Sequence, residues 1–497
     1  MIQIYRDEDC RFDVDGELLI QRLGEVLDGE SLLVEREDLK PYECDGMSGY
    51  RVLPKVAVIP HTIDQVHRIL AICHDLDVPV VTRGAGTSLS AGSLPHPQGV
   101  LLSMAKFNRI LEVDPDRRLA RVEPGVRNLA VSEAAAPHGL YYAPDPSSQI
   151  ACSIGGNVAE NAGGVHCLKY GLTVHNVLSA TMITIDGDVV TLGGEALDAP
   201  GLDLMAAIHG SEGMLGVITD ITVKLLPHPP VRSVLLASFD DVEKAGNAVA
   251  SIIAAGIIPA GLEMMDGPAI QAAEDFVHAG YPTDAEAILI GEFDGNAGEV
   301  ADQLEEVTAL LEQHGATEVR VARDEDEKAR FWAGRKAAFP AVGRISPDYY
   351  CMDGTIPRKH LAHVLQRMRE LSEEYGLRVV NVFHAGDGNL HPLVLYDGNV
   401  PGEFERTEEL GGRILELCVE VGGTVTGEHG VGMEKINQMC TQFPAAEIEQ
   451  FHALKAAFDP QGLLNPGKAI PTLNRCAEFG AMHVHEGNLP HPDIPRF

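Results

Sequence analysis

The stretch that decides the fold reads VVTRGAGTS at residues 80–88, an expected strand followed by a glycine-rich turn. A Rossmann dinucleotide fingerprint would need a third glycine at position 89, which is Leu89, and a helix directly after it, where we expect another strand. The turn can instead present backbone N–H groups and two hydroxyls to an anionic diphosphate, because glycine lets a ligand approach the backbone closely. Taken alone, the stretch also fits an ordinary glycine-rich turn.

Two further small-residue segments follow the first. One reads SIGGNVAENAGG at residues 153–164, after PDPSS at 144–148, and the other reads HGSEGMLGVIT at residues 209–219 and precedes an expected strand. Small-residue segments at these separate places predict one extended ligand that is held between loops.

In these segments the chain resembles the FAD-binding domain of the vanillyl-alcohol oxidase and p-cresol methylhydroxylase flavoprotein family. The resemblance implies that the first two segments hold the FAD pyrophosphate and lie beside its ring system, and that residues 212–218 line the adenosine end. Relatives that bind flavin covalently through the first loop have a histidine where this chain has Ala85, so we expect non-covalent FAD. The residues assigned to FAD by the resemblance are Arg83, Gly84, Ala85, Gly86, Thr87, Ser88, Pro144, Asp145, Ser148, Gly155, Gly156, Asn161, Gly163, Gly164, Glu212, Gly216, Ile218 and Asn465.

The composition predicts an acidic cytoplasmic enzyme. With 497 residues we expect at least two domains, and a formal net charge of −35 disfavours binding to nucleic acid or to anionic membrane surfaces. The longest charge-free apolar stretch, residues 245–262, is interrupted by glycine and proline, and the N-terminal sequence has no secretion-signal pattern. The 9 cysteines are scattered without a C-x-x-C pair, which predicts free thiols in a reducing compartment.

The predicted fold class is α+β. It combines a p-cresol methylhydroxylase-type (PCMH-type) two-subdomain FAD-binding domain with a ferredoxin-like α+β substrate (cap) domain and a C-terminal helical segment. The predicted boundaries are an N-terminal helical arm at 1–53, the FAD-binding domain at 54–229, the cap domain at 230–425, a segment returning to the flavin at 426–470, and a tail at 471–497.

Local patterns support this division. A capping box from Thr62 to Gln65 opens the helix of a β-α-β unit at the start of the FAD-binding domain. In the cap domain, strand, helix and strand follow one another twice, which predicts helices on one face of a sheet. A last helix at 446–458 is expected to bury Ile448, Phe451 and Leu454.

A histidine and carboxylate constellation lies in two motifs, HAGDGNLHP at residues 384–392 and TGEHGVG at residues 426–432. Two imidazoles and a carboxylate with an open position make a workable catalytic site for a divalent metal. Spacing leaves Zn, Mn and Fe open, and for each histidine by itself a hydrogen-bonded structural role is the alternative.

These motifs resemble those of the FAD-dependent 2-hydroxy acid dehydrogenases. The resemblance implies that His384, His391 and Glu428 hold the metal and that His429 is the catalytic base. It also makes Arg335 the clamp for the substrate carboxylate, since a guanidinium forms two parallel hydrogen bonds. The alternative for Arg335 is a solvated charge on a helix.

The expected reaction is oxidation of glycolate to glyoxylate, with D-lactate to pyruvate also plausible. Relatives that oxidise hydroxyglutarate place a lysine and a threonine where this chain has Cys351 and Phe339, and the neutral residues favour a short monocarboxylate. A stand-alone D-lactate dehydrogenase is the alternative within the same class. A non-catalytic FAD-binding scaffold subunit is the alternative from a different class.

Electrons must leave the flavin, and no cysteine cluster in this chain could hold an iron–sulfur centre. The resemblance implies an iron–sulfur partner subunit and a second FAD-domain subunit, with peripheral membrane contact only through these partners. The tail, with Cys476 and residues 483–485, could contact them, and a frayed terminus is the alternative.

Overall fold

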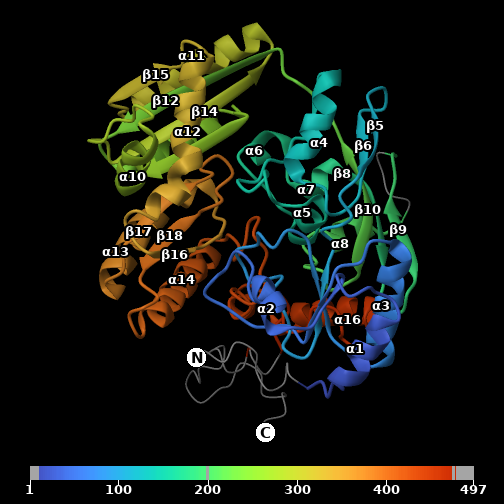
Figure 1. The fold of residues 1–497 in the computed structure, drawn as a ribbon. Helices are drawn as coiled ribbons and strands as arrows, with labels where there is room; N and C mark the ends of the chain where they lie inside the picture. Colours follow the sequence, from blue (N-terminus) through green and yellow to red (C-terminus); the bar gives the residue numbers. More distant parts are fainter. Residues whose placement is uncertain (1–10, 197–200, 473–475, 477–497) are drawn as a thin grey trace.

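The computed structural model describes residues 11–196, 201–472 and 476. Its strands form a four-, a five- and a two-stranded sheet in one body and a seven-stranded sheet in a second body, and the two bodies lie side by side (Figure 1). The predicted tail contacts at residues 483–485 lie outside the described residues.

The first sheet has four strands in the order β1-β2-β4-β3, with β2, β4 and β3 parallel. Helices α1 and α3 pack their apolar stripes on it, and the capping box that opens α3 is confirmed. The bounds are β1 (Leu32–Leu33), β2 (Val56–Val58), β3 (Val80–Arg83), β4 (Val100–Ser103), α1 (Gly16–Gly24) and α3 (Ile63–Asp75).

The second sheet has five antiparallel strands in the order β5-β6-β10-β8-β9, and α4 and α5 pack against it. The second glycine segment therefore forms α5, and the third leads into β10. The bounds are β5 (Ile110–Asp114), β6 (Leu119–Val122), β8 (Val177–Ile183), β9 (Val189–Gly193), β10 (Val217–Lys224), α4 (Asn128–Ala135) and α5 (Ile154–Glu160).

The second body contains a seven-stranded sheet in the order β15-β12-β14-β13-β17-β18-β16, with every neighbouring pair antiparallel. The strand bounds are β12 (Val231–Phe239), β13 (Gly261–Asp266), β14 (Ala287–Gly295), β15 (Glu318–Val321), β16 (Asp348–Cys351), β17 (Val379–Phe383) and β18 (Pro392–Tyr396). Helices cover both faces, with α9 (Val242–Ala254), α11 (Ala297–Gln313), α13 (Leu361–Tyr375) and α14 (Glu403–Glu420) on one and α10 (Gly267–Val277) and α12 (Glu325–Val342) on the other.

The prediction of helices on one face was therefore wrong. In β12, Leu235 and Ala237 belong to one apolar core, whereas Val234 and Leu236 belong to the other. Successive side chains of a strand point to opposite faces, so a strand that is apolar throughout needs cover on both.

The C-terminal segment returns to the first body. Helix α16 (Ala445–Phe458) buries Ile448, but Leu454 is exposed, contrary to the prediction. The adjacent Lys455 turns inward instead, where its Nζ donates to the carbonyls of Met214 and Leu464. Beyond α16, Leu464 forms a parallel bridge with Val80 in β3.

Cys440 and Cys476 form a disulfide, so the prediction that all thiols are free was wrong for this pair. The two residues are 36 positions apart, and no local pattern relates them. Within the described residues, no helix is long and apolar enough to cross a membrane.

Short elements complete the described chain. Strands β7 (Leu140–Tyr141) and β11 (Leu226–Pro227) pair with each other. The short helices are α2 (Arg36–Leu39), α6 (Cys167–Tyr170), α7 (Thr173–Asn176), α8 (Leu204–Ile208) and α15 (Met439–Gln442), and the 3-10 turns are η1 (Lys40–Tyr42), η2 (Ala136–His138) and η3 (Arg358–His360).

Candidate active site

The three glycine-rich segments come together in the structure. A Cβ atom on Gly84 would lie 2.2 Å from Ser153 Oγ, so the first turn packs directly on the start of α5. The third segment joins the other end of this helix, where the Gly210 and Glu212 amides donate to the carbonyls of Val158 and Ala159. The expectation that these separated segments meet around one place is confirmed.

The surroundings of these segments suit a polar ligand. Thr82 Oγ1, Arg83 Nε and Glu160 Oε2 are buried and lack a hydrogen-bond partner among the described residues. Gly86, with φ of 69°, and Gly164, with φ of 145°, hold backbone conformations that side chains with a Cβ rarely adopt. The Thr82 hydroxyl, the Arg83 Nε–H and the close backbone approach fit the diphosphate of a flavin, whereas the Glu160 carboxylate suits a hydrogen-bond donor on the ligand.

Several predicted FAD residues make contacts within the protein. Arg83 donates to the carbonyls of Cys44 and Ser93, and Asp145 Oδ2 pairs with His166 Nδ1 at 2.8 Å. Asn465 donates to the carbonyls of Gly92 and Glu212, which ties the C-terminal segment to the loops.

The other predicted FAD residues lie in or beside the same segments. Ser88 Oγ is 3.1 Å from Ser90 Oγ, Asn161 ends α5 with φ of 54°, and the Pro144 carbonyl accepts from Asn128. The Ser148 carbonyl accepts from the Cys152 amide. Gly216 and Ile218 lie at the start of β10, and the assignment of all these residues to FAD remains a prediction.

His384, His391 and Glu428 lie together in the structure, and their assignment to a metal stays a prediction. The Nε2 atoms of His384 and His391 lie 3.2 and 2.8 Å from the same oxygen, Glu428 Oε1. Behind them, His384 Nδ1 faces Glu263 Oε1 at 2.7 Å and His391 Nδ1 faces the Met352 carbonyl at 3.4 Å. Acceptors on Nδ1 orient imidazoles for metal binding through Nε2, so the residue types suit a divalent cation. Among the described residues, the groups whose ligand atoms lie within 4.8 Å of one another include His391 and Glu428 but not His384.

A second layer of charge surrounds this cluster. Glu263 is fully buried in β13 and pairs with Arg335, so Arg335 is a buried partner rather than a solvated charge. Although burial opposes its charge, His384 and Arg335 hold the pKa of Glu263 below its ordinary value. Burial also opposes the charged form of His384, but Glu263 and Glu428 outweigh it and hold the pKa of His384 well above its usual value.

Asp353 shapes the loop that carries Glu428. Its Oδ2 accepts from three successive amides, those of Gly427, Glu428 and His429, at 3.0, 3.1 and 2.8 Å. It also accepts from the Thr426 hydroxyl. One ligand atom each from Asp353, His391, Glu428 and His429 lie within 4.8 Å of one another. Because these donors already occupy Asp353, we assign it to the loop rather than to a cation.

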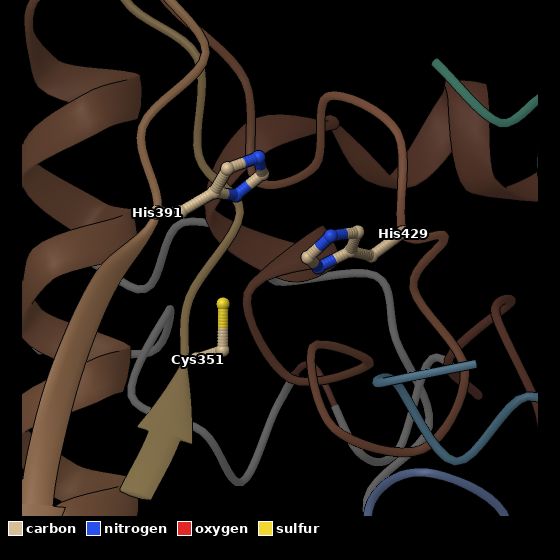
Figure 2. Close-up of side chains that lie close together, drawn as sticks. All are labelled: Cys351, His391 and His429. Atoms are coloured by element: carbon tan, nitrogen blue, oxygen red, sulfur yellow. The ribbon is translucent and has the colours of Figure 1, made fainter. Parts of the chain in front are cut away.

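His429 lies beside the cluster with its ring stacked on that of His391 (Figure 2), at 4.8 Å between centroids. Its Nδ1 is buried without a partner in the described chain, and burial lowers the pKa of His429 to about 4. A neutral imidazole with a lone pair is able to accept a proton. Cys351 approaches both rings from the end of β16, whereas Phe339 packs on Tyr349.

The predicted flavin segments and the predicted metal site are in contact at Gly163. A Cβ atom there would lie 2.5 Å from Glu428 Oε2, so the second glycine segment is in direct contact with the carboxylate of the cluster. The predicted flavin loop and the predicted metal ligand are therefore neighbours, although they are far apart in the sequence.

Sequence reasoning missed Glu263, Asp353 and Glu160. Each is a single carboxylate in an apolar or small-residue run. A charge at such a position is unfavourable without a partner, and this was the only signal in the sequence that these residues have a special role. Nothing in the sequence indicates the distant residues that pair with Glu263 and Asp353.

Comparisons with known proteins agree with this architecture. A family model described as FAD binding domain matches residues 54–193, and one described as FAD linked oxidases, C-terminal domain, matches residues 228–469. The solved structure of p-cresol methylhydroxylase with substrate bound superposes with a TM-score of 0.79 at 18% identity, covering 94% of this chain and 98% of that chain. The predicted α+β, PCMH-type fold is confirmed.

Two curated relatives span nearly the whole chain. The Glycolate oxidase subunit GlcD of Escherichia coli strain K12 is 67% identical over 485 residues, which cover 98% of this chain and 97% of the relative. The D-lactate dehydrogenase of Archaeoglobus fulgidus is 35% identical over 422 residues, which cover 84% of this chain and 92% of the relative. The two family models support FAD as the cofactor.

Proposed function

This chain belongs to the family of FAD-linked oxidases, and we propose that it oxidises glycolate to glyoxylate with a non-covalently bound FAD. The observation that carries the proposal is the contact at Gly163, because it joins the second flavin segment to Glu428. The 67% identity to a glycolate oxidase subunit supports glycolate as the substrate. Ala85, in place of a histidine, supports non-covalent attachment.

The reaction removes one proton from the substrate hydroxyl and one hydride from the adjacent carbon. When bound, FAD accepts the hydride, and a divalent cation polarises the hydroxyl. We assign the cation to His384, His391 and Glu428, with Zn, Mn and Fe as candidates. His429 takes the hydroxyl proton, since its buried imidazole is neutral at ordinary pH.

Arg335 holds the substrate carboxylate in this proposal. Its Nε–H donates to Glu263 Oε2, and its Nη2 forms an ion pair with the same oxygen at 2.7 Å. We assign the other N–H donors of the guanidinium to the substrate carboxylate. A short monocarboxylate also agrees with the neutral Cys351 beside the imidazoles.

Anaerobic mixing with substrate tests the proposal. Glycolate should bleach the flavin absorbance of the purified protein, while D-2-hydroxyglutarate should leave it unchanged. His429→Asn should slow bleaching by a factor of about 100 or more, whereas the exposed His363→Asn should bleach at the wild-type rate. An oxidised flavin that persists in glycolate would contradict the assignment.

D-lactate oxidation is the second candidate, favoured by the relative that is a D-lactate dehydrogenase. Comparing the bleaching rates for D-lactate and glycolate at equal concentration separates the two.

We also propose that the chain works as the catalytic subunit of a complex, because a relative at 67% identity is a subunit. The proposed partners are an iron–sulfur subunit and a second FAD-domain subunit, which bring the chain to the membrane periphery. Co-expression followed by affinity purification tests this arrangement, and a chain that transfers electrons at full rate without partners would contradict it.

A further inference from the structure

We propose that Glu263 is a positioning residue that links the guanidinium of Arg335 to the imidazole of His384, so that substrate and metal affinities depend on each other. The inference rests on the proposed function, which assigns the substrate carboxylate to Arg335 and the cation to His384.

The geometry of Glu263 carries the proposal. It lies in β13, near the middle of the seven-stranded sheet, and its side chain is fully buried. Oε2 accepts from Arg335 Nε at 2.7 Å and forms an ion pair with Arg335 Nη2 at 2.7 Å, whereas Oε1 faces His384 Nδ1 at 2.7 Å. The two oxygens of one carboxylate are thus divided between two residues of different predicted roles.

An ordinary structural ion pair does not account for this arrangement. A buried carboxylate needs compensation for its desolvation, and Arg335 supplies it at Oε2 alone, through the Nε–H hydrogen bond and the Nη2 ion pair. The second oxygen is nevertheless aimed at His384. A carboxylate on Nδ1–H fixes the imidazole tautomer and orientation and makes Nε2 a stronger metal ligand.

The linkage gives the coupling a sign. A substrate carboxylate on Arg335 competes with Glu263 for the positive charge of the guanidinium. The charge of Glu263 is then less compensated and acts more strongly on His384, which tightens metal binding. Thermodynamic reciprocity requires that the metal tighten carboxylate binding by the same factor.

Equilibrium binding of Mn²⁺ to the full-chain flavoprotein tests the proposal, with free Mn²⁺ measured by electron paramagnetic resonance. Acetate is the second probe, because it has the carboxylate but lacks the reacting hydroxyl, and chloride at equal ionic strength is its control. In the wild type, acetate should lower the Kd for Mn²⁺. Glu263→Gln should raise that Kd by a factor of about 10 to 100 and abolish the effect of acetate.

Arg335→Met should lower the Kd for Mn²⁺, because the charge of Glu263 then loses its compensation and acts more strongly on His384; an unchanged or higher Kd would contradict the coupling. Glu292→Gln is the matched control, because Glu292 is a buried glutamate of the neighbouring strand that pairs with His166 and Trp332. This control should bind Mn²⁺ as the wild type does. The double variant Glu263→Gln/Arg335→Met removes both charges, so it leaves no buried charge without a partner if a single variant fails to fold. The flavin content of each variant reports whether it has folded.

The outcomes separate the two claims. A wild-type protein that binds neither Mn²⁺ nor Zn²⁺ would overturn the metal site and the coupling with it. Unchanged Mn²⁺ affinity in Glu263→Gln, with binding intact in the wild type, would overturn the coupling and leave the proposed function standing.

Discussion

Replacing Gly84 with alanine tests whether contact between the first two glycine segments forms the flavin site. The added methyl group would lie 2.2 Å from Ser153 Oγ, a distance that real Cβ atoms do not adopt, but 3.5 Å from Ser153 Cβ and 3.6 Å from the Gly156 amide. The hydroxyl must therefore move. It caps α5 by accepting from the Gly156 amide at 3.3 Å, so its movement also loses the helix cap.

The magnitude follows from these two effects. Loss of an N-cap costs about 1 kcal/mol, and overpacking of a close contact costs roughly 1–3 kcal/mol more. If about 2 kcal/mol of this appears as weaker cofactor binding, the Kd for FAD rises roughly 30-fold. Titration of the apoprotein with FAD, followed by quenching of flavin fluorescence, measures the change.

Two variants control the result. Gly298→Ala adds a methyl group in α11 where nothing lies within 4 Å, so it should bind FAD normally. Gly84→Ala/Ser153→Ala removes the clashing oxygen and should bind FAD as well as Ser153→Ala alone. Wild-type affinity in Gly84→Ala, or a double variant no better than Gly84→Ala, would refute the reasoning.

Three further predictions concern the rest of the site. Asp353→Asn should lower kcat/KM about 100-fold, because it weakens the hydrogen bonds from the loop amides that position His429. Steady-state assays with a redox dye measure the change, and unaltered kinetics would exclude that role for Asp353. Dialysis against a chelator should lower turnover by a factor of about 100 or more at constant flavin content, with recovery on adding one divalent metal, since several kcal/mol of Lewis-acid stabilisation is lost. Burial opposes the charged form of His166, but Asp145 and Glu292 outweigh burial and hold the pKa of His166 well above its usual value. The stability that charged His166 contributes is therefore complete below about pH 6.5, and it is lost as the pH rises through the folded-state pKa. Thermal unfolding should therefore show a gap of about 2 kcal/mol between wild type and His166→Gln at mildly acidic pH that narrows at alkaline pH, and a gap that widens would contradict the sign.

The sequence predicted those parts of the fold and site that have local signals. The capping box at Thr62 is complete within four residues. The glycine content of the three segments indicates that other groups can approach their backbone closely. The convergence of His384, His391 and Glu428 followed from short motifs that resemble a known family. In each case the information lies within a few neighbouring residues.

The rest depended on contacts between distant residues. Glu263 is 121 positions from His384 and 72 from Arg335, so its role is invisible without the folded sheet. The outward turn of Leu454 followed from Lys455 occupying the buried face of α16, which helical periodicity cannot anticipate. Pairing of Cys440 with Cys476 likewise depends on how the chain end returns, rather than on cysteine spacing.

The return of the C-terminal segment has a consequence for biosynthesis. Val80, at the start of the strand before the first glycine turn, pairs with Leu464, and Asn465 donates to the carbonyl of Gly92, 373 positions earlier. A ribosome releases the N-terminal strands long before it adds these residues, and domains generally fold in the order of their synthesis. A nascent chain therefore lacks these contacts of the first glycine segment through most of translation, and we expect FAD to bind only after residue 465 has emerged.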